Sequence, residues 1–159
     1  MSVVFAIDPG PMESAFVRLA DDDIRDYGKI PNADLLRKLD TASYISDAVA
    51  IEMIASYGMP VGAEVFETCV WIGRFMQACG NTPIKRITRI AVKNHLCHSS
   101  KAKDANIRQA LIDRFGGPDA IGKKAKQGPL YGVSGDVWSA LAVAVTWMDA
   151  QQELIEVTA

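Results

Sequence analysis

Three short apolar segments open the chain, and the turns between them are too short to contain a helix. The segments cover residues 2–7, 14–19 and 24–30, and turns rich in Asp, Pro and Gly separate them. Apolar, partly β-branched runs bounded by such residues predict strands. Strands joined by such short connections run antiparallel, because a parallel pair needs a long crossover. The first 30 residues therefore predict an antiparallel meander.

The remaining sequence predicts helices that alternate with two further strands. We expect strands over residues 48–54 and 83–88, and helices from Asn32 onward and over residues 62–79, 90–96, 102–115 and 135–151, the last capped by Ser134. A helical crossover leads to residues 48–54, so that strand should run parallel to a neighbour. We find no repeat and no linker that divides the chain. We therefore expect one α/β domain over residues 1–159, a mixed five-stranded sheet flanked by helices.

The helix expected over residues 62–79 is apolar around most of its circumference. Only a narrow stripe of Glu, Arg and Gln is polar, which predicts burial on more than one side, with Cys69 and Cys79 in the core. A helix at a dimer interface and a buried central helix would both show this pattern.

The charge is unevenly distributed along the chain. The net charge is −2 overall, but residues 1–80 carry −6 and residues 81–159 carry +4. Residues 81–131 hold eleven basic side chains against three acidic ones. This basic segment indicates a polyanionic partner, with ordinary solvated helix faces as the alternative.

Several protein classes are excluded by what the sequence lacks. It has no apolar run long enough to span a membrane, and the start MSVVFAIDPG does not resemble a signal peptide. Three cysteines without framework spacing fit a reducing cytoplasm. There is no phosphate-binding loop or dinucleotide fingerprint, so we expect no nucleotide cofactor. His95 and His98 lack a second ligand pair and do not predict a zinc site.

Three carboxylates stand in apolar surroundings and are the best candidates for chemistry. Asp8 ends the first strand, Glu52 lies in or at the end of another, and Asp136 lies in the first turn of the last helix. Buried carboxylates are costly unless they are paired or bind a metal. Together they predict a site for Mg²⁺ or Mn²⁺. Individually, they also fit a turn, a solvated strand end and a helix N-terminus.

Four segments resemble motifs of the RuvC family of Holliday-junction resolvases, in the same order and over nearly the whole chain, particularly the short versions that phages encode. The first two are Phe5-Ala6-Ile7-Asp8-Pro9-Gly10 and Ala50-Ile51-Glu52, which are similar to the family's first two acid motifs. The third, Lys101-Ala102-Lys103-Asp104, resembles its lysine-bearing segment. The fourth, Asp136-Val137-Trp138-Ser139-Ala140-Leu141-Ala142, resembles its final helix, except that Ser139 stands where the family has a fourth acid.

The resemblance implies an RNase H-like fold and a homodimer that makes paired, Mg²⁺-dependent nicks in branched DNA. It implies that Asp8, Glu52 and Asp136 are metal ligands, with Ser139 beside them, and that Lys103, or alternatively Lys101, lies near the scissile phosphate. With this fold we expect DNA contacts from the basic residues Lys85, Arg86, Arg89, Lys93, Lys101, Lys103, Lys123, Lys124 and Lys126.

We therefore predict a Mg²⁺-dependent endonuclease that resolves four-way and other branched DNA. The alternatives are a junction-binding protein without catalysis, to which Ser139 points, and an RNase H-like nuclease with another nucleic-acid substrate. An actin-like ATPase fragment is a weaker alternative, because phosphate-binding loops are missing.

Overall fold

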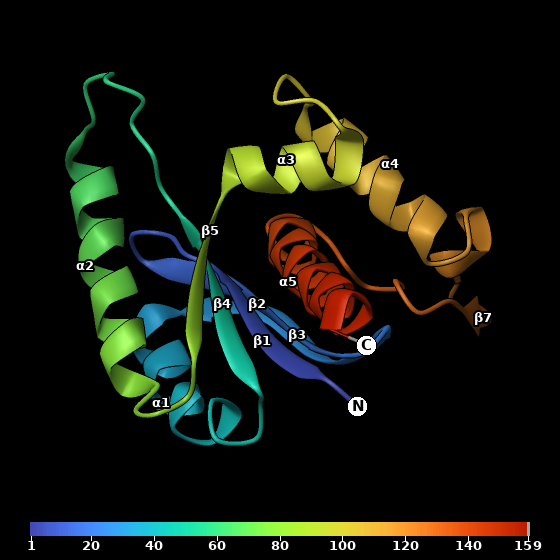
Figure 1. Cartoon of the computed structure of the whole chain (residues 1–159), viewed down its shortest axis with the longest axis horizontal. Coiled ribbons are helices and arrows are strands. Elements are labelled where there is room, and N and C mark those ends of the chain that lie inside the picture. Colours follow the sequence, from blue (N-terminus) through green and yellow to red (C-terminus); the bar gives the residue numbers. More distant parts are fainter. Residues whose placement is uncertain (159) are drawn as a thin grey trace.

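The computed structural model describes residues 1–158, which form a five-stranded mixed sheet with helices on both faces (Figure 1). The strand order across the sheet is β3-β2-β1-β4-β5. The strands are β1 (Val3–Asp8), β2 (Glu13–Ala20), β3 (Asp23–Pro31), β4 (Ala48–Met53) and β5 (Ile84–Thr88). The expected fold class is thus confirmed.

The strand directions follow from the lengths of the connections. β2 pairs antiparallel with both β1 and β3, which confirms the meander, and β4 runs parallel to β1 and to β5. In the register of the central pair, Ile7 lies opposite Ile51. Asp8 and Glu52 each follow these residues directly, so both acids lie at the same edge of the sheet.

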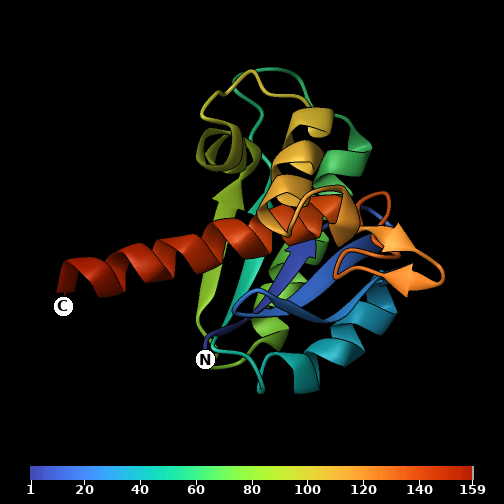
Figure 2. The ribbon, with the colours of Figure 1, turned by 90° about the vertical axis from the view of Figure 1, so that its right-hand side faces the viewer.

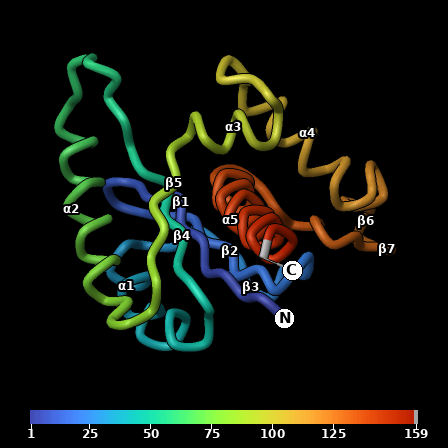
Figure 3. Tube along the Cα trace, viewed as in Figure 1, coloured from blue at the N-terminus to red at the C-terminus, as the bar shows by residue number. Residues whose placement is uncertain are grey.

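Side-chain alternation along the central strands divides the core into two layers. Phe5 and Ile7 face α1 (Asn32–Ala42) and α2 (Ala63–Ala78), whereas Val4 and Ala6 face the layer built around α5 (Val137–Thr158). The tube in Figure 3 shows the two layers on opposite sides of the sheet. Outside α5 lie α3 (Arg89–Cys97) and α4 (Asp104–Arg114), and Ile107, Leu111 and Ile112 of α4 are buried.

The outer face of α2 differs from the sequence-based expectation. Only Thr68, Ile72 and Phe75 of this helix are buried, while Phe66 is 63% exposed and Val70 is 57% exposed. Cys79 is buried as expected, but Cys69 is exposed. The prediction of burial on more than one side is wrong for the single chain, because α1 and the sheet lie against the inner side only.

The last helix begins later and ends later than expected. It starts at Val137, and the Asp136 carbonyl accepts a hydrogen bond from the Ala140 amide at 3.1 Å. Asp136 therefore takes the capping position that we predicted for Ser134. In Figure 2 the helix crosses the molecule and continues past the sheet to the C-terminus. None of the described helices is long and apolar enough to cross a membrane.

The segment between α4 and α5 contains a small hairpin. A short helical turn, η1 (Pro118–Ala120), precedes β6 (Gly122–Lys123) and β7 (Lys126–Gln127). The side chains of Lys123, Lys124 and Lys126 are exposed on this hairpin, which lies at the opposite end of the view from the C-terminus in Figure 2.

Candidate functional site

Asp8 and Glu52 are brought together because parallel strands end at the same edge of the sheet. They line an open cleft of about 370 Å³ at that edge. Arg89, Asp104 and Ser139 line the same cleft, from the start of α3, the start of α4 and the first turn of α5. The cleft is therefore formed by the starts of three helices around the ends of two strands.

The Asp8 carboxyl group is strongly perturbed. Burial raises the pKa of Asp8 to about 9, together with a hydrogen bond to Glu52 and the negative charges of Glu52 and Asp136. Arg89 acts in the opposite direction. Near neutral pH, in the absence of a cation, the Asp8 carboxyl group is therefore protonated, and its O–H can donate a hydrogen bond to Glu52.

Asp136 lies near this pair but is held by another partner. Its Oδ2 lies 2.7 Å from Nζ of Lys29 on β3, and both side chains are about half exposed. The hydrogen bond and charge of Asp136 raise the pKa of Lys29. We predicted that three carboxylates would converge. In the described chain, no three His, Cys, Asp or Glu side chains form a group that could hold a metal ion.

The reason for this difference is the ion pair with Lys29, which the sequence analysis missed. Asp136 is close enough to raise the pKa of Asp8, but its carboxylate points to a cation on the third strand. Asp8 and Glu52 are thus assembled as a pair, and Asp136 lies at their margin with Ser139 one turn further along α5.

Arg89 lies inside the acidic cleft, although the charge pattern marked it only as a DNA contact. Its Nη1 lies 3.6 Å from Oε1 of Glu52, and its Nη2 donates to Oδ1 of Asp104. Arg89 directly follows β5, which is parallel to β4 and ends at the same edge as Glu52. That position after the strand is the sequence signal that could have placed it in the site.

A second cleft of about 500 Å³ continues from the first. Arg89, Asp104 and Ser139 belong to both, and Arg108, Ser134 and Asp136 line only the second. The acidic pair therefore lies in one part of a longer open surface between α3, α4 and α5.

The other predicted basic residues are spread over several surfaces. Lys103 is the residue before α4; its side chain is exposed and does not line the cleft, whereas the adjacent Asp104 does. Lys101 is exposed in the preceding turn, and Lys93 is half-buried on α3. Arg86 is exposed on β5. Lys85 lines a groove with Ser2 and Trp147 near the start of β5, so the structure does not bring it to the acidic site.

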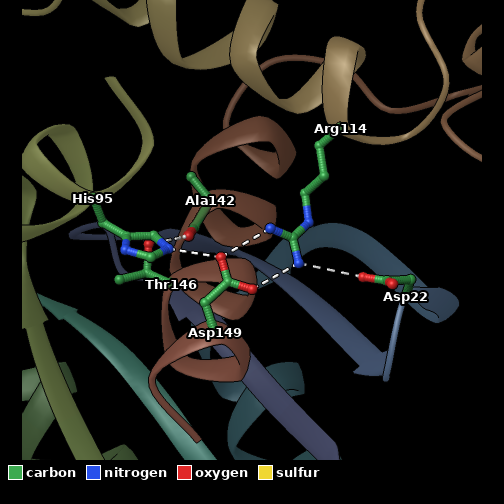
Figure 4. Close-up of polar contacts among 6 residues, drawn as sticks. All are labelled: Asp22, His95, Arg114, Ala142, Thr146 and Asp149. Atoms are coloured by element: carbon green, nitrogen blue, oxygen red, sulfur yellow. Dashed lines mark hydrogen bonds and ion pairs between the residues drawn. The ribbon is translucent and has the colours of Figure 1, made fainter. Parts of the chain in front are cut away.

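Asp149 on α5 forms a second polar cluster with His95, Arg114 and Asp22 (Figure 4), and none of these residues lines either cleft. The Asp149 carboxylate accepts hydrogen bonds from Arg114 Nη1 and Nη2 at 2.8 and 2.7 Å and from His95 Nε2 at 2.6 Å. Arg114 also reaches Asp22 at 3.4 Å. Burial opposes the effect, but the hydrogen bonds and charges of Arg114 and His95 hold the pKa of Asp149 below its usual value. This cluster joins α3, α4 and α5 to the turn after β2.

The donor set at the first cleft fits a divalent cation. Asp8 and Glu52 offer hard carboxylate oxygens, and burial, together with the neighbouring acids, raises the pKa of Asp8. Asp136 would supply a third carboxylate if it left Lys29. The arrangement can hold a cation between strand ends beside an open surface, which is a suitable place for a phosphate group.

Two solved structures are similar to the chain over nearly its whole length. The first is the Thermus thermophilus RuvC structure, with 18% sequence identity and a TM-score of 0.68, covering 95% of this chain and 96% of that chain. The second is T. thermophilus RuvC in complex with a Holliday junction substrate, with 18% identity and a TM-score of 0.69, covering 96% and 97%. No family model and no curated protein matches the sequence. The chain therefore has the RuvC-like, RNase H-like fold.

Proposed function

We propose that this chain, which has the fold of RuvC, is a metal-dependent endonuclease that resolves four-way and other branched DNA by paired nicks in the cytoplasm. The observation that carries the proposal is the pair of Asp8 and Glu52 at the ends of two parallel strands in an open cleft. The similar structure that contains a Holliday junction supports the choice of substrate.

In this proposal Asp8 and Glu52 hold Mg²⁺, with Mn²⁺ as a substitute, and Asp136 and Ser139 complete the site. A divalent cation bound there supplies activation of a water molecule and neutralisation of the phosphate charge. The protein's own residues orient these groups. The strand ends fix Asp8 and Glu52, and the start of α5 presents Asp136 and Ser139 on neighbouring positions of one face.

The DNA path in this proposal crosses the basic surfaces around the cleft. Lys101 and Lys103 precede α4 beside the site, and the hairpin lysines at positions 123, 124 and 126 extend the positive surface. Phosphate contacts of this kind position a duplex arm without selecting a base sequence. Recognition of branched DNA would then depend on the relative placement of two such paths.

A homodimer supplies two paths and two sites. The outer face of α2 exposes Phe66, Cys69 and Val70, and we propose that a second copy covers it. A two-fold axis would relate the two clefts, so paired nicks would follow from symmetry. Sedimentation of the chain, compared with a Phe66→Glu and Val70→Glu variant, tests this step, and the variant should be monomeric.

The deciding experiment is a cleavage assay on a labelled four-way junction with and without Mg²⁺. Linear duplex and RNA–DNA hybrid substrates are run beside it. Symmetric nicks in the junction that require Mg²⁺ are expected. Preferential cutting of the hybrid would contradict the proposal and indicate another RNase H-like nuclease.

A junction-binding protein without catalysis is a second candidate. Two observations favour it, namely Ser139 in place of an acid and the ion pair that draws Asp136 to Lys29. Tight junction binding with no cleavage in either Mg²⁺ or Mn²⁺ would establish it.

A further inference from the structure

Arg89 occupies a fixed position between the two parts of the cleft surface. It is the first residue of α3, and the preceding Thr88 caps this helix by accepting a hydrogen bond from the Ala91 amide at 3.2 Å. Arg89 lines both clefts, and its side chain is 26% exposed. Its guanidinium group therefore lies at the boundary between the acidic pair and the α4–α5 surface.

The two terminal nitrogen atoms of the Arg89 guanidinium group differ in their contacts. Nη2 donates a hydrogen bond to Asp104. Nη1 lies 3.6 Å from Oε1 of Glu52, which is close enough for charge attraction but too long for a hydrogen bond. Nη1 is also buried, and it has no hydrogen-bond partner among residues 1–158. An unpaired buried donor is unfavourable. A hydrogen bond from Nη1 to Glu52 would remove this cost, so a movement of the guanidinium group toward Glu52 is energetically favoured.

Asp104 restrains that movement from the opposite side. It is the first residue of α4, and its side chain is 89% exposed. Because one planar group contacts both acids, a closer approach of Arg89 to Glu52 would weaken its bond to Asp104. An exposed carboxylate can thus control the position of a cation beside the acidic pair.

We infer that Arg89 is a positioning residue shared between Glu52 and Asp104, and that Asp104 sets how strongly Asp8 and Glu52 bind a divalent cation. This inference rests on the metal-dependent function proposed above. Arg89 competes with the cation for Glu52 and repels it. Asp104 draws Arg89 away and keeps Oε1 of Glu52 accessible.

The competition predicts opposite effects for the two partners. Removing the charge of Arg89 should tighten cation binding about tenfold, because a positive charge beside the ligands is removed. Removing the charge of Asp104 should weaken cation binding about threefold or more, because Arg89 can then close on Glu52. In the double variant, Asp104 should have no further effect.

The test is calorimetric titration of Mn²⁺ alone, without DNA, into the full chain and its Arg89→Met, Asp104→Asn and doubly substituted variants. Arg86→Met and Asp113→Asn are matched controls, because they make the same charge changes on β5 and at the far end of α4. Circular dichroism checks that each variant is folded. Asp104→Asn should leave the fold intact, since the Asp104 side chain is largely exposed to solvent.

Opposite shifts that are absent in the controls, with a double variant that behaves like Arg89→Met, support the inference. A double-mutant cycle with additive effects would overturn it, because Asp104 would then act directly and not through Arg89. Unchanged binding in Arg89→Met would overturn it while the metal-dependent function stands. A wild-type chain that binds no Mn²⁺ would overturn both.

Discussion

The carboxylates of Asp8 and Asp149 are both largely buried, but their surroundings are opposite. Asp149 accepts hydrogen bonds from Arg114 and His95, and its pKa lies below the usual value. Asp8 faces Glu52, and burial and that neighbour raise its pKa to about 9. In the Asp149 cluster, the negative charge of Asp149 is offset by Arg114. In the Asp8 cluster, which consists of Asp8, Glu52, Asp136 and Arg89, the acids outnumber the bases, and the acidic pair lies in an open cleft.

The difference distinguishes a structural ion pair from a candidate site. A balanced cluster such as that of Asp149 stabilises the packing of α5 against α3 and α4 and needs nothing from solution. An unbalanced cluster destabilises the empty protein and is stabilised by a bound cation. Substitutions should therefore affect the two clusters in opposite ways.

The largest expected effect is that of Asp8→Asn on cleavage. The amide keeps the shape of the carboxyl group but removes a metal ligand's charge, so junction cleavage should fall by about 10²–10³-fold or more. Junction binding should stay near the wild-type level. In cation-free buffer the variant should have a higher melting temperature, since a neutral amide replaces an acid that is buried beside another. Wild-type cleavage in Asp8→Asn would show that the site is elsewhere.

Asp149→Asn should have the opposite profile. It leaves Arg114 without its main partner in a half-buried position, which should cost about 2 kcal/mol of folding free energy. For a chain of this length, that corresponds to a melting temperature lower by several degrees. Cleavage per folded molecule should be unchanged. Calorimetric melting and a cleavage assay at low temperature measure the two effects, and reduced cleavage at unchanged stability would contradict the structural role.

The three exposed lysines of the β6–β7 hairpin extend the comparison to cations that make no ion pair within the described part of the chain. Among the described residues, no ion pair involves Lys123, Lys124 or Lys126, and all three are exposed. Replacing all three by alanine should weaken junction binding about tenfold. The slope of log affinity against log salt should decrease by about 0.9 for each phosphate that the hairpin no longer neutralises. An identical slope would show that this hairpin does not touch DNA.

The contrast between Asp8 and Asp149 also predicts a smaller effect, on how the stability of the fold depends on pH. The pKa of Asp8 is raised from 3.8, so the folded chain binds more protons than the unfolded chain up to about pH 9. Stability in the presence of a chelator should therefore fall as the pH rises from about 4 to 9. The pKa of Asp149 is lowered, so its contribution should be lost as the pH falls below the usual value of 3.8.

Melting temperatures measured across this range check both directions. Asp8→Asn should remove the decrease at high pH and leave the decrease at low pH. If the wild-type chain gains stability between pH 5 and pH 8, the burial of a protonated Asp8 is not the dominant effect in this range.

The sequence predicted the acidic pair because strand direction follows from local features. Short turns required a meander, a helical crossover required β4 to be parallel to β1, and parallel strands end at one edge. That argument places Asp8 beside Glu52 without any side-chain detail.

The partners of the other charges could not be predicted in the same way. Lys29 reaches Asp136 across 107 residues of sequence, and His95 and Arg114 reach Asp149 across 54 and 35. A count of charges by segment does not show which basic side chains are paired within the chain. The pattern of apolar residues in α2 likewise predicted more burial than the structure has. The pattern shows that the outer face is apolar, with Phe66 and Val70 on it, but it does not show whether another element covers that face.

The smallest expected effect on cleavage is that of replacing Ser139. This residue lies in the first turn of α5, near the acidic pair, whereas Asp149 lies further along the same helix. Ser139 lines both clefts one turn after Asp136. A hydroxyl group can orient a water molecule but adds no negative charge, so Ser139→Ala should reduce cleavage by no more than about threefold. Asp136→Asn, its matched neighbour, should reduce it far more. Equal inactivity of the two variants would give the serine a direct catalytic role.

Ser139→Asp tests the same position in the other direction. An added carboxylate suits a hard cation and should tighten Mn²⁺ binding in the absence of DNA, as measured by calorimetry. It would also make the Asp8 cluster still more acidic without a cation, so the melting temperature in chelator should fall. Both effects require that position 139 faces the acidic pair. If cation affinity and melting temperature both match the wild type, Ser139 belongs to the surface between α4 and α5, and the site consists of Asp8, Glu52 and Asp136 alone.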